Sequence, residues 1–221
     1  MTTPSRTNWL VPTGLIVLSV VPVLASGIRV AELSGAVDVA VTMDNERFFV
    51  APVPILVHVV SASLFSVIGA LQFVPGLRRH RWHRHAGRVL VPLGLAVAGS
   101  ALWMTVTYPL PARDSVLLSA FRLLFGSGMA LSILLGTAAL RRGDFAGHGA
   151  WMTRGYAIAV GAGTQGVLLG FWEAAVGGPG VFARALLHGA AWVLNLAVAE
   201  TAIRRRTRSS RVPTPAHAHA A

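Results

Sequence analysis

Long apolar stretches alternate with short polar segments along the chain, and this alternation predicts membrane-spanning helices. The hydrocarbon core of a bilayer is about 30 Å thick, so a helix needs about 20 predominantly apolar residues to cross it. Stretches of that kind occur at about residues 10–29, 51–74, 89–108, 116–140, 150–171 and 182–203. We therefore expect an all-α fold, an integral membrane bundle of six transmembrane helices within residues 1–203.

Arginine is concentrated in every second polar segment. Short loops rich in arginine are retained in the cytoplasm, which fixes the expected orientation. The arginine-rich segments include Arg6, the stretch from Arg78 to Arg88, the pair Arg141 and Arg142, and the stretch from Arg204 to Arg211. We expect both termini in the cytoplasm, with a basic, flexible cytoplasmic tail over residues 204–221. The arginine-rich face also predicts contact with anionic lipid.

Composition narrows the classes of function. Of the 221 residues, 54% are hydrophobic and only 12% are charged, which is too apolar for an ordinary water-soluble domain. A net charge of +11 often indicates a nucleic-acid partner, but the hydropathy argues against one here. The chain has no cysteine, so disulfides, thiolate metal ligands and cysteine nucleophiles are excluded. Any metal would be held by histidine or carboxylate.

Four ionisable side chains lie within the predicted spans at similar depth. His58, Arg122 and His188 are each seven or eight residues from the same end of their spans, which is roughly 10 to 12 Å at the helical rise. Arg184 precedes His188 by one turn. Because charged groups within lipid are costly, such residues indicate function by default. We expect these four residues to converge in one layer of the outer half of the membrane.

One interpretation of this layer is a b-type haem. His58 and His188 would ligate the iron from opposite faces, and Arg122 and Arg184 would pair with the propionates. A haem b is held by its axial ligands and by packing, so the absence of a CxxCH motif is no obstacle. This interpretation predicts a redox-linked membrane protein.

Other interpretations use the same residues differently. Arg122 and Arg184 would clamp the ligand of a carrier or binding protein for a small anionic or lipid-like molecule. Alternatively, each group is paired separately, with Arg122 on Asp114 or Glu173, in a structural membrane protein without a catalytic site. A zinc hydrolase is disfavoured because no intramembrane carboxylate is placed as a base near His58.

A second candidate cluster lies at the predicted cytoplasmic rim. His83 and Arg88 precede the third span, and His148 and Arg154 open the fifth. The alternative is anchoring by arginines and by an aromatic belt of Trp82, Trp151 and Tyr156. Arg154 lies a turn inside the membrane, and its natural partner is Glu200 near the end of the last span.

Several short motifs together resemble a known family. They are His58 early in a span, Gly69-Ala-Leu-Gln-Phe73, Leu77-Arg78, His83-Arg-x-x-Gly-Arg88, His148-x-x-Trp-Met-x-Arg-x-Tyr-Ala157 and Gly161-Ala-Gly-Thr-Gln165. Across residues 50 to 200 this combination is similar to the bacterial multi-pass membrane family named domain of unknown function 2306. The resemblance implies a small inner-membrane protein with no established reaction. It favours His83 over His80 or His85 as the meaningful histidine of its loop.

Overall fold

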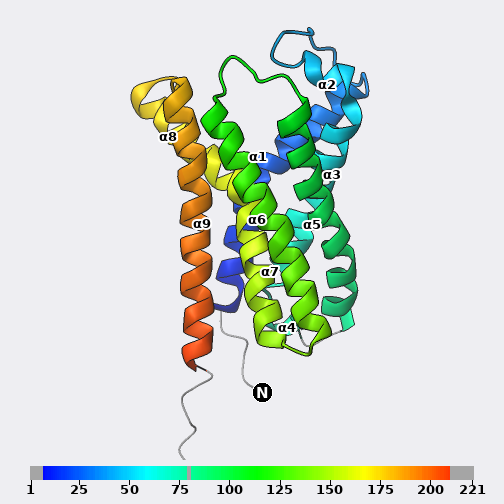
Figure 1. Ribbon diagram of the computed structural model, residues 1–221, viewed down its shortest axis with the longest axis vertical. Coiled ribbons are helices and arrows are strands. Elements are labelled where there is room, and N and C mark those ends of the chain that lie inside the picture. The colour runs from blue at the N-terminus through cyan, green and yellow to red at the C-terminus, as the bar shows by residue number, and fades with distance from the viewer. Residues whose placement is uncertain (1–6, 79–80, 210–221) are drawn as a thin grey trace, which may run out of the picture.

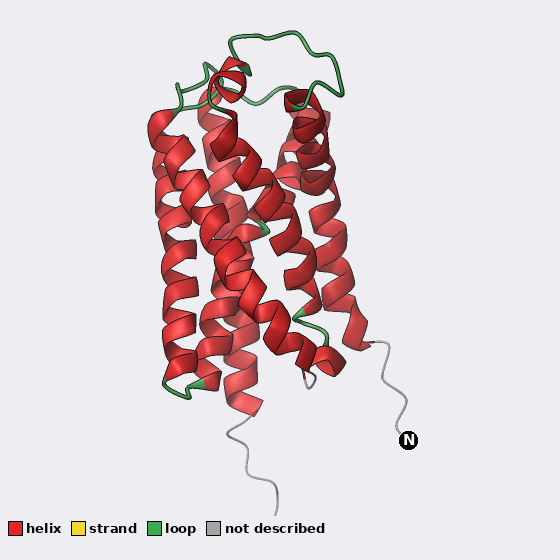
Figure 2. Cartoon of the chain, turned by 90° about the vertical axis from the view of Figure 1, so that its right-hand side faces the viewer, coloured by secondary structure: helices red, strands yellow, loops and turns green. Residues whose placement is uncertain are grey.

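The computed structural model describes residues 7–78 and 81–209, and regular structure in this part of the chain is entirely helical (Figure 1). The helices are α1 Thr7–Leu33, α2 Glu46–Val50, α3 Pro52–Leu71, α4 Pro75–Arg78, α5 Arg81–Thr107, α6 Val116–Arg141, α7 Phe145–Ala159, α8 Gly161–Val176 and α9 Val181–Ser209. Figure 2 shows the long helices running side by side, with most loops gathered at the two ends of the bundle.

Five helices are long and apolar enough to cross a membrane, namely α1, α3, α5, α6 and α9. Their outward faces carry large apolar side chains, such as Leu10, Val106 and Phe182, that are 69%, 73% and 66% exposed. Only a lipid environment accommodates so much apolar surface without a large hydration cost. The chain is therefore a membrane protein whose long helices match five of the six expected spans.

The expected span over residues 150–171 is corrected by the structure. In its place are two shorter helices, α7 and α8, which meet at Val160. Glycines follow the break because neighbours approach closely there: a Cβ atom on Gly161 would lie 2.5 Å from Trp192 of α9. Hydropathy does not detect this break because apolar residues continue across it, from Ala157 to Val160 and on into α8.

The helix ends also extend beyond the predicted spans. α5 begins at Arg81 rather than near residue 89, and α9 continues through the arginines to Ser209. Arginine is a good helix former and is favoured near a helix C-terminus, so a helix need not stop at the membrane surface. The first residues of the expected flexible tail, 204–209, are thus helical, while residues 210–221 lie outside the described residues.

The helices form a closed ring in the order α1, α3, α5, α6, α9 and α8, each in contact with the next. α7 contacts α3, α5, α6 and α9, and its second half, where Thr153, Tyr156 and Ile158 are buried, lies in the interior of the ring. Figure 1 shows α7 in the lower half of the bundle and α8 diverging from it toward the upper left. Beyond the break, the chain therefore leaves the interior and joins the wall.

Two ends of the bundle are distinguished by charge. The start of α5, the turn between α6 and α7 and the end of α9 lie together at the lower end in Figure 1, which we call the arginine end. The loop between α5 and α6 lies at the other end, which we call the Asp114 end. This arrangement brings together three of the arginine-rich segments, as the sequence pattern predicts. Arg6 lies outside the described residues.

Tyr156 of α7 fixes the packing of the arginine half. Its hydroxyl donates a hydrogen bond to the carbonyl oxygen of Ser66 at 2.7 Å, and its ring lies against Gly69, where a Cβ atom would be 2.3 Å away. The rings of Phe65 and Phe73 are 5.8 and 5.2 Å from the Tyr156 ring centroid. The bundle interior is consequently filled on this side of the break.

Candidate functional site

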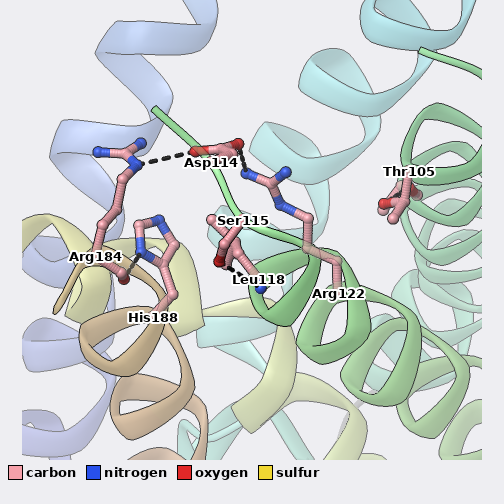
Figure 3. A network of polar contacts seen from close by, with 8 residues as sticks. Thr105, Asp114, Ser115, Leu118, Arg122, Arg184 and His188 are labelled. Carbon is pink, nitrogen blue, oxygen red and sulfur yellow. Dashed lines mark hydrogen bonds and ion pairs between the residues drawn. The ribbon is translucent and has the colours of Figure 1, made fainter. Parts of the chain in front are cut away.

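Asp114 joins α6 to α9 at its end of the bundle (Figure 3). Its Oδ2 atom accepts a hydrogen bond from Nη2 of Arg122 at 2.8 Å, and its Oδ1 atom accepts one from Nε of Arg184 at 3.0 Å. The Asp114 side chain is only 4% exposed, whereas the two arginine side chains are 33% and 23% exposed. One carboxylate thus holds the two intramembrane arginines that the sequence placed in one layer.

The loop before α6 positions this carboxylate. Ser115 is the N-cap of α6, and its Oγ atom accepts a hydrogen bond from the backbone N–H of Leu118. Asp114 immediately precedes the cap, and its own N–H donates to the carbonyl of Pro111 at 2.9 Å. A negative charge is favourable at the start of a helix, so the local sequence supports the bridge.

The charge state of Asp114 is decided by two opposing effects. Burial alone would raise the pKa of this carboxyl group. The guanidiniums of Arg122 and Arg184 outweigh burial and hold the pKa below its ordinary value. The carboxylate is therefore ionised at neutral pH, and the bridge is an ion triad rather than a neutral hydrogen-bonded cluster.

His188 lies beside the bridge, one turn after Arg184 (Figure 3). The residue is buried, and its Nδ1 atom is 2.8 Å from the carbonyl oxygen of Arg184. A carbonyl oxygen can only accept a hydrogen bond, so we assign the proton of the neutral ring to Nδ1. The Nε2 atom then carries the lone pair with which imidazole accepts a hydrogen bond or ligates a metal.

His58 on α3 shows the same pattern. Its Nδ1 atom is 3.1 Å from both the carbonyl oxygen of Val97 and the hydroxyl oxygen of Ser100 on α5. The Ser100 hydroxyl donates to carbonyl groups of its own helix, which leaves the imidazole to donate at Nδ1. His58 and His188 are therefore assigned the same tautomer, with Nε2 available on each.

A cavity of about 470 Å³ lies between the helices in the half of the bundle nearest Asp114. His58, Arg122 and His188 all line it, together with Gln165 of α8 and Trp192 of α9. The break at Val160 explains its position, because α7 fills the interior only on the arginine side and α8 then joins the wall. Most of the remaining lining is apolar and includes residues of α1, α3 and α5.

The structure thus brings three of the four predicted residues to one cavity. Arg184 does not line it but is tied to its rim through Asp114. Sequence reasoning considered Asp114 only as a partner of Arg122 and missed its role as a bridge. The signal available was its position directly before a capping serine at the start of an apolar stretch.

Arg47 was also missed as a cavity residue. It belongs to the short helix α2, lies half-buried, and forms no ion pair with any residue of the described ranges. Its guanidinium and that of Arg29 lie 4.5 and 4.6 Å from the ring centroid of Phe48, and Phe48 in turn meets the Tyr108 ring edge-on. These contacts hold α2 over the cavity. They place a second positive charge, that of Arg47, near the opening of the cavity.

The residues of the second predicted cluster differ in their exposure and in their contacts. Arg88 is exposed on the outward face of α5, whereas His83 is half-buried. The Nδ1 atom of His148 is 2.9 Å from the carbonyl oxygen of Gly136 on α6. Helical periodicity separates His83 from Arg88, which the proximity of the two residues in sequence does not reveal.

Arg154 pairs with Glu200, as the sequence predicts. Its Nε and Nη2 atoms donate to Oε1 and Oε2 of Glu200 at 2.5 and 3.1 Å, a two-pronged pairing of α7 with α9. The guanidinium also lies 4.6 Å from the ring centroid of Trp151. With its charge and its planar face both engaged, Arg154 serves as a link between helices.

Comparison with known proteins identifies the family of this chain. Residues 55–203, more than half of the chain, match the model of a family described as predicted membrane protein (DUF2306). No curated protein and no solved structure matches the chain. The matched range includes His58, the Asp114 bridge, the break at Val160 and the Arg154–Glu200 pair, whereas Arg47 precedes it.

Proposed function

The chain belongs to the family of predicted membrane proteins DUF2306, and we propose that it binds an amphiphile with one apolar chain and an anionic headgroup. The observation that carries this proposal is the pairing of positive charge with an apolar cavity. Arg122 and Arg47 both line the cavity, whereas its deeper lining includes Ala62, Met129 and Ile158.

The charge balance at the mouth favours an anion. Arg122 and Arg184 share the single carboxylate of Asp114, so the triad retains one positive charge. Arg47 adds a second positive charge near the mouth. Guanidinium groups bind carboxylate or phosphate oxygens through paired hydrogen bonds, which are strongest where water is scarce.

The shape of the cavity favours an apolar chain below that headgroup. Arg122 and Met129 both line it and are separated by seven residues of α6, which is about 10 Å along the helix. Within that depth the polar groups are few, chiefly serine hydroxyls, His58 and Gln165. Ser19 and Ser63 donate to carbonyls of their own helices, which further lowers their polarity.

The membrane frame of this proposal counts α7 and α8 together as one interrupted span. The chain then crosses a bacterial plasma membrane six times, with the arginine end in the cytoplasm. The cavity lies in the outer half of the bilayer, within reach of an amphiphile in that leaflet. Reporter fusions near Trp82 and near Asp114 test this orientation, and an exported Trp82 segment would contradict it.

The binding test uses Trp192, which lines the cavity, as a probe. Brominated dodecanoate should quench the fluorescence of the purified protein, and Trp192→Phe should remove most of that quenching. Arg47→Gln leaves the Asp114 bridge intact and should weaken dodecanoate binding by at least about tenfold, since a charge-assisted hydrogen bond contributes about 1.5 to 3 kcal/mol. Brominated dodecanol, which has no charge, should not distinguish wild type from Arg47→Gln.

A matched control and a decisive negative result accompany this test. Arg141→Gln removes an exposed arginine at the opposite end of the bundle and should leave dodecanoate binding unchanged. Equal binding by wild type, Arg47→Gln and Arg122→Gln would contradict the proposal. Failure of both anionic and neutral probes to quench Trp192 would instead favour a structural protein without a small-molecule site.

A haem b is the second candidate, and one observation favours it. Both His58 and His188 line the cavity, and each has its Nδ1 atom on a backbone carbonyl. This outer hydrogen bond is typical of ligating histidines because it fixes the tautomer and directs Nε2 to the metal. Bound haem would supply one-electron chemistry, with Arg122 and Arg184 near its propionates.

Spectroscopy distinguishes the two candidates. If haem binds through both imidazoles, protein supplemented with haem should show a Soret band that is lost in His58→Ala and in His188→Ala. The amphiphile proposal predicts that both variants still bind brominated dodecanoate. A colourless protein after haem supplementation would exclude the haem candidate.

A further inference from the structure

The first two turns of α5 carry a compact group of basic side chains. Arg81, Arg84, His85 and Arg88 follow the spacing of one helix face, and all four are exposed. Together they line a hollow of about 320 Å³ that lies far from the cavity, at the arginine end. We call these four residues the basic stripe.

The basic stripe continues directly into the lipid-facing side of α5. On the same face, Pro92 and Gly99 are exposed along the middle of the helix, and Trp103 and Val106, which are 61% and 73% exposed, lie near its far end. The opposite face is buried at Leu90, Gly94, Val97 and Ala98. In a bilayer, the basic stripe would therefore stand at the level of the lipid headgroups, and the apolar face of α5 would meet the acyl chains.

Within the described part of the chain, no acidic side chain neutralises the basic stripe. None of its arginines forms an ion pair with any residue from 7 to 78 or from 81 to 209. At this end of the bundle, Asp144 caps α7 by accepting from the N–H of Gly147, and Glu200 pairs with Arg154. Positive charges spaced by three or four residues repel one another, so an anion among them would stabilise the helix start.

We propose that the basic stripe binds the phosphate headgroup of an anionic phospholipid, with the acyl chains lying along the exposed face of α5. Because the basic stripe stands on the same helix face as the exposed apolar residues Pro92 and Trp103, the arrangement favours a lipid over free phosphate. Three guanidiniums favour a phosphate monoester, such as that of phosphatidic acid, over a zwitterionic headgroup. This proposal is independent of the cavity at the other end.

The test compares two lipids on the full chain. Native mass spectrometry of the purified protein, titrated with phosphatidic acid or phosphatidylcholine of the same acyl chains, measures how much of each lipid binds. Wild type should prefer phosphatidic acid, and the triple variant Arg81→Gln/Arg84→Gln/Arg88→Gln should lose that preference. Each arginine near a membrane surface accounts for roughly fivefold in affinity, so the preference should fall by at least about tenfold.

A second triple variant controls for overall charge. Arg205→Gln/Arg206→Gln/Arg208→Gln removes the same number of charges at the same end of the bundle, from exposed positions of α9. It should keep the preference for phosphatidic acid. An equal loss in both triple variants, no loss in either, or displacement of the lipid by excess inorganic phosphate would overturn the proposal.

Discussion

Trp192 of α9 lies directly against Gly161, the first residue after the break between α7 and α8. A Cβ atom on Gly161 would be 2.5 Å from both Cδ1 and Nε1 of the indole. The same indole stacks on Phe125 at 4.8 Å and lines the cavity. The residue that bounds the cavity is therefore also the one that requires glycine at the break.

Gly161→Ala should destabilise the protein and narrow the cavity. The added methyl group forces the Trp192 ring to move, and overpacking of this kind costs about 1 to 3 kcal/mol. Thermal unfolding in detergent measures the loss of stability. Gly170→Ala is the matched control in α8, because a Cβ atom there meets nothing within 4 Å. Equal melting temperatures for the two variants would contradict a close contact between Gly161 and the Trp192 ring.

Asp114→Asn should destabilise the Asp114 end although it preserves the shape of the side chain. The substitution leaves Arg122 and Arg184 without their shared counter-charge, which should lower stability by about 2 kcal/mol. Both arginines are partly exposed, so this cost is smaller than that of breaking a fully buried ion pair. Chemical unfolding measures this cost. Asp38→Asn changes an exposed carboxylate without an ion pair in the described chain, and it should have little effect.

The same bridge predicts acid sensitivity. The pKa of Asp114 is lower in the folded protein than its ordinary value of 3.8, so the bridge contributes fully above that value. The contribution of the bridge to the free energy of unfolding decreases as the pH falls below 3.8 and through the pKa of the folded protein. In that range the Asp114 carboxyl group of the unfolded chain carries a proton, which it must lose before the bridge can form. The difference in melting temperature between wild type and Asp114→Asn should therefore narrow on acidification. A constant difference from neutral pH to pH 3 would argue against the ion triad.

Tyr156→Phe tests the packing of α7 inside the ring. The variant keeps the ring against Gly69 but removes the hydrogen bond to Ser66, which should cost about 0.5 to 1.5 kcal/mol. The variant's free energy of unfolding reports this loss. Thr201→Val removes a hydroxyl that is bonded only within its own helix and serves as the comparison. If Thr201→Val were as destabilising as Tyr156→Phe, the Tyr156–Ser66 hydrogen bond would stabilise the protein no more than a hydrogen bond within one helix.

Local sequence was enough to predict the long helices and several of their pairings. Apolar length identified α1, α3, α5, α6 and α9 because a bilayer sets a minimum length for a spanning helix. The need to neutralise a buried charge identified Glu200 as the partner of Arg154 and Asp114 as one of two partners for Arg122. Depth along the spans also placed His58, Arg122 and His188 at one level.

Other features depend on contacts between residues far apart in sequence. The second function of Asp114, its bond to Arg184, joins residues separated by 70 positions. The interruption at Val160 depends on how closely α1 and α9 approach the glycines that follow it. A hydropathy profile contains neither distance, so the fifth apolar stretch looked continuous.

The sequence by itself determined that this chain is a helical membrane protein with three arginine-rich segments at one end, because the hydrophobic effect and the positive-inside rule act on local composition. Only the tertiary structure decided that α8 leaves the interior and that three predicted residues consequently face one cavity. A cavity is the space that packed helices leave unfilled, and its position follows from their mutual approach rather than from the composition of any one helix.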